Sequence, residues 1–189
     1  MIYVLIGMLA ITTSCMQEVD QKKVPNEEEE VFVTDSSYNP EAVLAKMGIE
    51  LKTPTAPVAN YVNVVRSGNL IFLSGKGPSK EDGSYITGKV GKDLSIEEGY
   101  EAARLTGINQ LGVLKAELGN LNRVKQIVKT FGMVNSSPEF ENHPEVINGF
   151  SDLMVAVFGE RGKHARSAVG MGSLPRNIAV EIEVIVEVE

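Results

Sequence analysis

The segment 179–188 alternates apolar and mostly acidic residues, and this pattern constrains the fold more than any other. Valine or isoleucine occupies every second position from Val180 to Val188, and glutamate occupies most of the positions between them. Because successive side chains of a β-strand point to opposite faces, one face of this strand is predicted to be buried and the other to be mostly acidic. The chain is therefore expected to build a sheet that other elements cover on one face.

Two long helices are predicted to supply that cover. Ser95 and Glu98 match a capping box, apolar residues then recur at helical spacing as far as Leu118, and Gly119 ends the pattern. Pro144 opens a second long helix, which ends before Gly159.

The other segments predict short elements. A short helix begins at Asn39-Pro40 and stops at Gly48, and the segment 53–59 is an extended connector. Strands are predicted over 61–66, 69–74, 124–134 and 166–171, with a hairpin turn at Ser67-Gly68 and a loop over 75–83. This order indicates an α+β domain with one mixed sheet and both long helices on one face. No third long helix covers the other face, so we expect self-association.

The charge distribution argues against a nucleic-acid partner. The net charge is −7, but seven of the 25 acidic residues and only two of the 18 basic residues precede Ser37. The remainder is nearly neutral and has no basic stripe with which to neutralise phosphates. The sequence also lacks glycine-rich nucleotide motifs, and its single cysteine and two separated histidines argue against a structural zinc site. We therefore expect no cofactor and no metal.

The first residues have the pattern of a targeting segment. A short apolar run over 2–11 is followed by small polar residues and then by Cys15, the only cysteine. Residues 1–15 are similar to a bacterial lipoprotein signal, which would lipidate Cys15 and anchor an exported protein to an envelope membrane. The run lacks a preceding Lys or Arg, so a non-lipidated signal and a mis-called start codon, with a cytoplasmic protein, stay as alternatives. The acidic segment 16–37 predicts a disordered tether, and 38–189 the folded domain.

Arg166 and Glu181 are the candidate catalytic pair. An arginine that opens an apolar strand offers a planar fork that fits a carboxylate with two hydrogen bonds. Glu181 follows on the next strand and can transfer a proton, so a carboxylate clamp and a base are expected close together. A structural ion pair between the two is an equal alternative. Glu183 lies on the same face of the strand as Glu181, so spacing alone does not decide which of the two is the base.

Several other positions break local rules or carry polar groups. Asn148-Gly149 lies in the middle of the second long helix, where both residues are unfavourable, and this indicates either a functional site or a close packing contact. Ser74-Gly75 ends a buried strand and places a hydroxyl group at the edge of the sheet. This indicates either part of a functional site or a simple turn. Tyr61 fits core packing when taken alone, and His164 fits a hydrogen-bonded histidine better than a catalyst.

Taken together, these residues resemble the RidA/YjgF family of reactive intermediate deaminases, also named the endoribonuclease L-PSP family. The resemblance runs from about Pro40 to the end and rests on the following segments: Asn60-Tyr61-Val62, Leu73-Ser74-Gly75, Gly88-Lys89-Val90-Gly91, Ala102-Ala103-Arg104, Val134-Asn135, Val146-Ile147-Asn148, Ala165-Arg166-Ser167-Ala168-Val169, Leu174-Pro175 and Val180-Glu181-Ile182-Glu183. It implies a chorismate-mutase-like fold in a homotrimer, with the sheets around a central barrel and sites between subunits.

The resemblance also implies a set of site residues. Arg166 matches the carboxylate-binding arginine, and Tyr61, Ser74, Asn148 and Glu181 fall on other site positions. Ala168 stands where the family often has cysteine, and its backbone carbonyl would help to hold a water molecule. Lys76 and Gly170 replace a common Gln and a common Glu, which affects the expected substrate more than the expected chemistry.

Three functions are consistent with these observations. The first is hydrolytic deamination of small enamine or imine acids such as 2-aminoacrylate, which gives a 2-keto acid and ammonia without a cofactor. The second is a non-catalytic trimeric module that binds a small carboxylate, which an exported location would favour. The third, an endoribonuclease, is disfavoured by the nearly neutral domain.

Overall fold

The computed structural model describes residues 38–54 and 59–189. The predicted signal segment 1–15 with Cys15, the predicted tether 16–37 and part of the extended connector lie outside the described residues. Within the described ranges, no helix combines the length and the apolar character needed to cross a bilayer.

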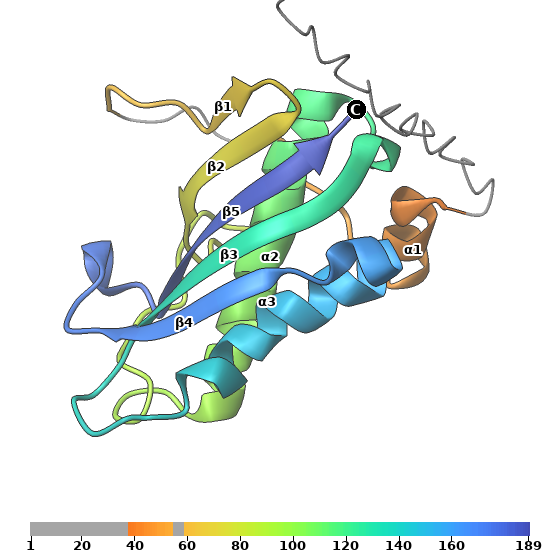
Figure 1. Ribbon diagram of the computed structural model, residues 1–189. Helices are drawn as coiled ribbons and strands as arrows, with labels where there is room; N and C mark the ends of the chain where they lie inside the picture. Colours follow the sequence, from red (N-terminus) through yellow and green to blue (C-terminus); the bar gives the residue numbers. More distant parts are fainter. Residues whose placement is uncertain (1–37, 55–58) are drawn as a thin grey trace, which may run out of the picture. The chain divides into compact units, whose positions relative to one another are not determined.

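The core of the fold is a mixed sheet of five strands (Figure 1). Its strands are β1 (Val64–Ser67), β2 (Leu70–Lys76), β3 (Val124–Asn135), β4 (Ala165–Met171) and β5 (Val180–Val188), in the spatial order β1-β2-β5-β3-β4. β3 and β4 are parallel, and every other neighbouring pair is antiparallel. The alternating C-terminal segment is thus the central strand.

The helices α2 (Ile96–Leu118) and α3 (His143–Phe158) lie on the same side of the sheet (Figure 1). The side chains of β5 from Val180 to Val188 that alternate toward the helices are buried, whereas Glu183 on the opposite face is exposed. The prediction of an α+β sheet with both long helices on one face is confirmed. In the single chain the other face carries exposed Val65 and Phe72, as an uncovered sheet should.

Local signals place most element ends correctly. The Asn39 side chain caps α1 (Pro40–Lys46), and Gly48 beyond it has a φ of 68°. Ser95 and Glu98 form the predicted capping box, and α2 ends before Gly119, which has a φ of 73°. The third helix begins at His143, one residue before the predicted Pro144.

The first hairpin differs from the prediction. Its two turn residues are Gly68 and Asn69 rather than Ser67-Gly68, and β1 begins at Val64 rather than Tyr61. β2 also runs on to Lys76, through a register shift between Leu73 and Lys76. The bulge removes the regular partner that residues 61–63 would need, so these residues are not part of the strand.

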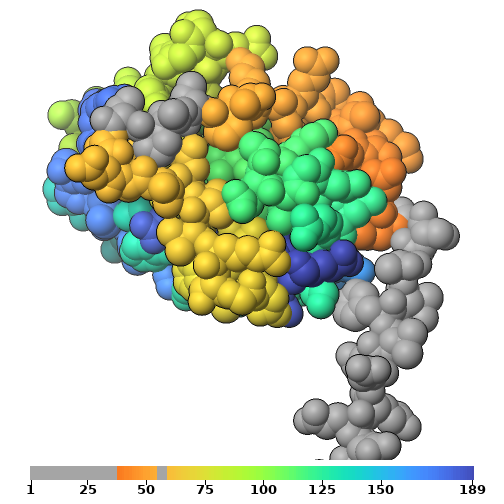
Figure 2. Space-filling model, turned by 90° about the horizontal axis from the view of Figure 1, so that it is seen from above, coloured from red at the N-terminus to blue at the C-terminus, as the bar shows by residue number. Residues whose placement is uncertain are grey.

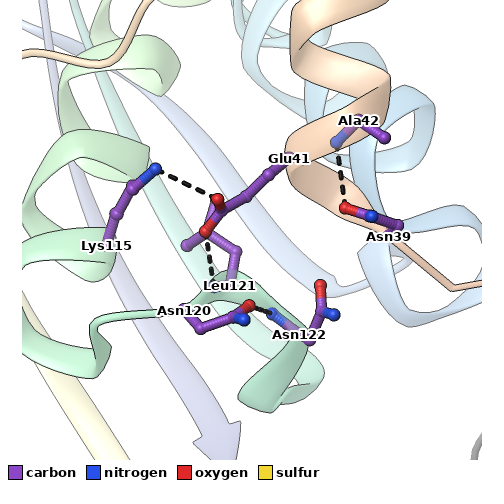
Figure 3. Close-up of polar contacts among 7 residues, drawn as sticks. All are labelled: Asn39, Glu41, Ala42, Lys115, Asn120, Leu121 and Asn122. Atoms are coloured by element: carbon purple, nitrogen blue, oxygen red, sulfur yellow. Dashed lines mark hydrogen bonds and ion pairs between the residues drawn. The ribbon is translucent and has the colours of Figure 1, made fainter.

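The short helix α1 is fixed to the rest of the fold by one carboxylate (Figure 3). Glu41 forms an ion pair of 3.1 Å with Lys115 near the end of α2, and it accepts a hydrogen bond of 3.3 Å from the backbone N–H of Leu121. Leu121 begins η1 (Leu121–Arg123), the short 3₁₀ helix that leads into β3. The chain before the sheet is thereby held against the C-terminal end of α2.

Gly149 is required by helix packing. A Cβ atom at this position would overlap the carbonyl oxygen of Tyr100 and lie 3.1 Å from the backbone nitrogen of Arg104, both in α2. The backbones of α2 and α3 therefore meet at this point, which explains a glycine in a helix interior. Of the two alternatives for Asn148-Gly149, close packing accounts for the glycine.

We predict that Gly149→Ala lowers the free energy of unfolding by about 1–3 kcal/mol, because the added methyl group must push two helices apart. Chemical denaturation monitored by circular dichroism measures this change. Gly172→Ala is the matched control, because a Cβ there meets no atom within 4 Å. Equal stabilities of the two variants would show that the helix contact is not tight.

Candidate active site

Arg166 lies on the edge strand β4 and points toward α3. Its Nη1 atom donates to the Asn148 side-chain oxygen at 2.8 Å and to the Ser151 hydroxyl at 3.1 Å. Both acceptors are on α3, three residues apart, so the same helix face presents them. Within the described part of the chain, no hydrogen bond uses the Nε or Nη2 atoms of Arg166. The guanidinium is thus held through Nη1 alone. The edge formed by Nε and Nη2 remains available to donate two hydrogen bonds to a carboxylate.

A series of hydrogen bonds links Arg166 through Ser151 and His164 to the backbone of Gly162. His164 Nδ1 lies 2.7 Å from the carbonyl oxygen of Gly162, which can only accept, so Nδ1 carries the proton. In the neutral ring Nε2 then accepts from the Ser151 hydroxyl at 3.1 Å, and that hydroxyl accepts from Arg166. The order of donors and acceptors fixes the Ser151 hydroxyl and, through it, the arginine.

The neutral form of His164 is favoured. Burial lowers the pKa of His164, and the positive charge of Arg166 lowers this pKa further, although the hydrogen bond to Gly162 opposes the shift. His164 therefore acts as a hydrogen-bonded support, in agreement with the sequence interpretation. Ser151 was not among the predicted residues, but its position three residues after Asn148 could have identified it.

Glu181 occupies the opposite face of the sheet. It lies between Val180 and Ile182, whose side chains are buried against the helices, so its own side chain points to the uncovered face. A Cβ at Gly75 would overlap the Glu181 carboxylate, which places this carboxylate directly over the Gly75 backbone. Burial raises the pKa of Glu181, and the nearby carboxylate of Glu183 raises it further.

Ser74 holds the segment that follows Tyr61. The Ser74 hydroxyl donates to the Val62 carbonyl at 2.7 Å, and its backbone N–H donates to the Asn63 carbonyl at 3.0 Å. These two bonds hold the segment before β1 against the bulge of β2. Tyr61, at the start of that segment, is 52% exposed rather than packed in the core.

Ala168 lies near Arg166 but not near Glu181. It pairs with Gly132 of β3, and its partly buried side chain packs against the main core. Gly170 follows Ala168 by two residues on β4. A Cβ atom at Gly170 would overlap the imidazole ring of His143, so the glycine leaves space for this ring. The same imidazole ring forms a hydrogen bond of 3.1 Å between its Nε2 atom and the Ser136 hydroxyl.

The predicted site residues form two separate groups in one chain. Arg166 and Ala168 belong to β4 and Asn148 to α3. Glu181 belongs to β5 and Ser74 to β2, and Tyr61 lies just before β1. β3 lies between β4 and β5, and the register places Arg166 beside Thr130 but Glu181 beside Met133. Arg166 and Glu181 are therefore about 10 Å apart across the sheet and about 10 Å along it, on opposite faces.

The expectation that Arg166 and Glu181 lie close together does not hold within one chain. The alternative, an ion pair between them, does not hold either, because Arg166 contacts Asn148 and Ser151 instead. Closeness along the sequence was misleading, since the strand between them in space comes from residues 124–135. Within the described ranges there is also no group of three or more His, Cys, Asp or Glu side chains placed to hold a metal ion.

Comparison with known proteins identifies the relatives of this chain. Residues 41–188 match a family model described as "YjgF/chorismate mutase-like, putative endoribonuclease". Protein TCP17 of Trypanosoma cruzi is 44% identical over 147 residues, which cover 77% of this chain and 92% of that protein. A 2-iminobutanoate/2-iminopropanoate deaminase of Dermatophagoides farinae is 27% identical over 142 residues, 74% of this chain and 95% of that protein.

Solved structures support the same fold. A crystal structure of a protein of unknown function from Agrobacterium tumefaciens is 43% identical and superposes with a TM-score of 0.73. The superposition covers 79% of this chain and 94% of the other. The chorismate-mutase-like architecture expected from the sequence is therefore confirmed at the level of the single chain.

We predict that Glu181→Gln raises the melting temperature at neutral pH. The raised pKa means that the folded chain holds the proton more tightly than the unfolded chain. The stability gained from this tighter proton binding is fully present below the ordinary glutamate pKa of 4.5. It is lost as the pH rises through the higher pKa of Glu181 in the folded chain. Glutamine removes the buried charge, so its advantage in thermal unfolding should shrink as pH falls toward 4.5.

The control is Glu139→Gln, a change at an exposed glutamate on the loop before α3. This variant should unfold like the original chain at each pH. A Glu181→Gln advantage that is absent, or that grows on acidification, would contradict the assignment of a destabilising buried charge.

Proposed function

Because this chain belongs to the YjgF/chorismate mutase-like family, to which the RidA proteins also belong, we propose that it hydrolyses small enamine or imine acids. The substrates are of the 2-aminoacrylate type, and the products are a 2-keto acid and ammonia. The single observation that carries this proposal is the bidentate edge of Arg166 left available by Asn148 and Ser151. The relative named as a 2-iminobutanoate/2-iminopropanoate deaminase supports the same chemistry at 27% identity.

Arg166 binds the substrate carboxylate in this proposal. The Nε–Nη2 edge offers two parallel N–H donors, which match the two oxygens of a carboxylate. The bonds to Asn148 and Ser151 hold the guanidinium in place before the substrate arrives, which lowers the entropy cost of binding. A substrate without a carboxylate would lose this interaction.

Glu181 is the proton-transfer group. It takes a proton from a water molecule as the water oxygen bonds to the carbon of the protonated imine, and the C=N electron pair moves to nitrogen to give an amino alcohol. Glu181 then returns this proton to the amine, the C–N bond breaks with release of ammonia, and the hydroxyl group loses its proton as the keto group forms. A carboxylate whose pKa is raised by burial is a stronger base than an ordinary glutamate. The Ala168 carbonyl helps to hold the water, and Tyr61 and Ser74 donate or accept hydrogen bonds around it.

A second copy of the chain completes the site. One chain keeps Arg166 and Glu181 on opposite faces of its sheet, so only a neighbouring copy can bring the missing group. The uncovered face supports this arrangement, because it holds exposed Val65 and Phe72 and a hollow of about 350 Å³ beside Phe131 and Ile185. The assembly proposed is a homotrimer in which these faces surround a central barrel.

We predict that Arg166→Ala lowers kcat/KM for 2-aminoacrylate, generated enzymatically, by at least about 100-fold, because the charge-assisted fork is lost. Keto-acid release measures the rate, and size-exclusion chromatography establishes that the assembly persists. Arg166→Lys should recover only part of the rate, since an ammonium group cannot form the fork.

Lys92→Ala removes an exposed cation and is the control. An Arg166→Ala variant as active as this control would exclude the proposed clamp. If the original chain released no keto acid but gained thermal stability from small carboxylates, it would be a binding module rather than a deaminase.

A further inference from the structure

A cavity of about 480 Å³ lies beside α2, between two segments that precede and follow the first hairpin. One wall is the segment 47–54, the other is the loop over 76–85, and α2 forms the floor. Figure 2 shows the orange residues that follow α1 next to the green surface of α2. Neither Arg166 nor Glu181 lines this cavity, nor do the other proposed site residues.

Both walls are attached directly to α2. A Cβ at Gly112 would lie 2.6 Å from the carbonyl oxygen of Lys52, so the segment 47–54 touches the helix backbone there. The Asn109 side chain donates to the carbonyl oxygens of Gly77 and Ser79 at 3.1 and 3.2 Å, and thereby holds the loop. The ion pair of Glu41 and Lys115 fixes α1 just before the first wall (Figure 3). The cavity is thus built by packed elements, with a volume typical of small-molecule sites.

The interior of the cavity combines apolar surface with positive charge. Ile49, Leu105 and Ile108 supply apolar surface, and Lys76 and Arg104 are its half-buried charged residues. The other charged residues that line it, which include Glu50 and Glu81 as well as two lysines, are exposed at its rim.

Lys76 has no acidic partner among the described residues. Its ammonium group donates to the neutral Asn63 side chain at 2.6 Å, and no described carboxylate lies within 4.0 Å of it. Burial lowers the pKa of Lys76, which expresses the cost of removing this cation from water. Arg104 makes no hydrogen bond or ion pair within residues 38–54 and 59–189 either. A partly buried cation without a counter-charge is costly unless an anion offsets it.

We propose that this cavity binds a small organic acid with an apolar body, whose carboxylate meets Lys76 and whose apolar part lies over Leu105 and Ile108. Arg104 on the floor adds a second positive charge and excludes cationic ligands. The proposal does not use the residues assigned above to the deamination reaction, none of which lines this cavity.

The test is isothermal titration of the full chain with 3-phenylpropanoate and with its neutral amide, 3-phenylpropanamide. We expect the acid to bind with a Kd of about 1 mM or tighter, and the amide to bind at least about ten-fold more weakly. Lys76→Met should weaken binding of the acid about ten-fold, while Lys92→Met at an exposed position leaves it unchanged. Ile108→Trp should fill the cavity and abolish binding of both compounds.

Arg166→Ala separates this site from the proposed reaction site, and it should bind the acid as the original chain does. The proposal is overturned if the acid does not bind at about 10 mM, if the acid and the amide bind equally, or if Lys76→Met has no effect. Binding that survives in Lys76→Met but disappears in Arg166→Ala would belong to the reaction site and would also overturn it. The comparison of acid with amide on the unmodified chain remains decisive if either cavity variant fails to fold.

Discussion

Burial of one face of β5 against α2 and α3 is the constraint on which the rest of the structure depends. The strand lies at the centre of the sheet, and its side chains from Val180 to Val188 on the helix face are all buried. Each fully buried side chain of this kind contributes roughly 1.5–3 kcal/mol relative to exposure. Because side chains alternate, the same burial fixes Glu181 and Glu183 on the opposite face. A shift of one residue would exchange the two sets, so the register that builds the core also places the proposed base.

The two faces explain why the proposed site needs more than one chain. Arg166 is held on the helix side by Asn148 and Ser151, while the Glu181 carboxylate lies over Gly75 on the uncovered side. No side-chain rotation brings these groups together through an intact sheet. The proposed self-association would cover exposed apolar side chains such as Phe72, and it would also bring Arg166 of one copy to Glu181 of another.

Local signals in the sequence predicted the elements well, because caps and periodicity act over a few residues. Ser95, Gly119 and the alternation of β5 each determine structure in their own neighbourhood. The strand order was beyond such signals, since β5 pairs with strands that begin 110 and 56 residues before it. For the same reason, the separation of Arg166 from Glu181 could not be read from their closeness in sequence. The cavity beside Lys76 likewise depends on the packing of the segment 47–54 against Gly112, and no sequence motif predicts this packing.

The central claim is that Arg166 of one copy and Glu181 of another act in the same site, and mixing inactive variants tests it most directly. Arg166→Ala and Glu181→Gln chains are unfolded together in equal amounts and refolded, and keto-acid release from 2-aminoacrylate is measured. In a mixed trimer, one of the sites then receives both original side chains, so about one quarter of the original activity should return. If mixed assemblies form and remain inactive, the two residues belong to the same chain's site and the account is wrong.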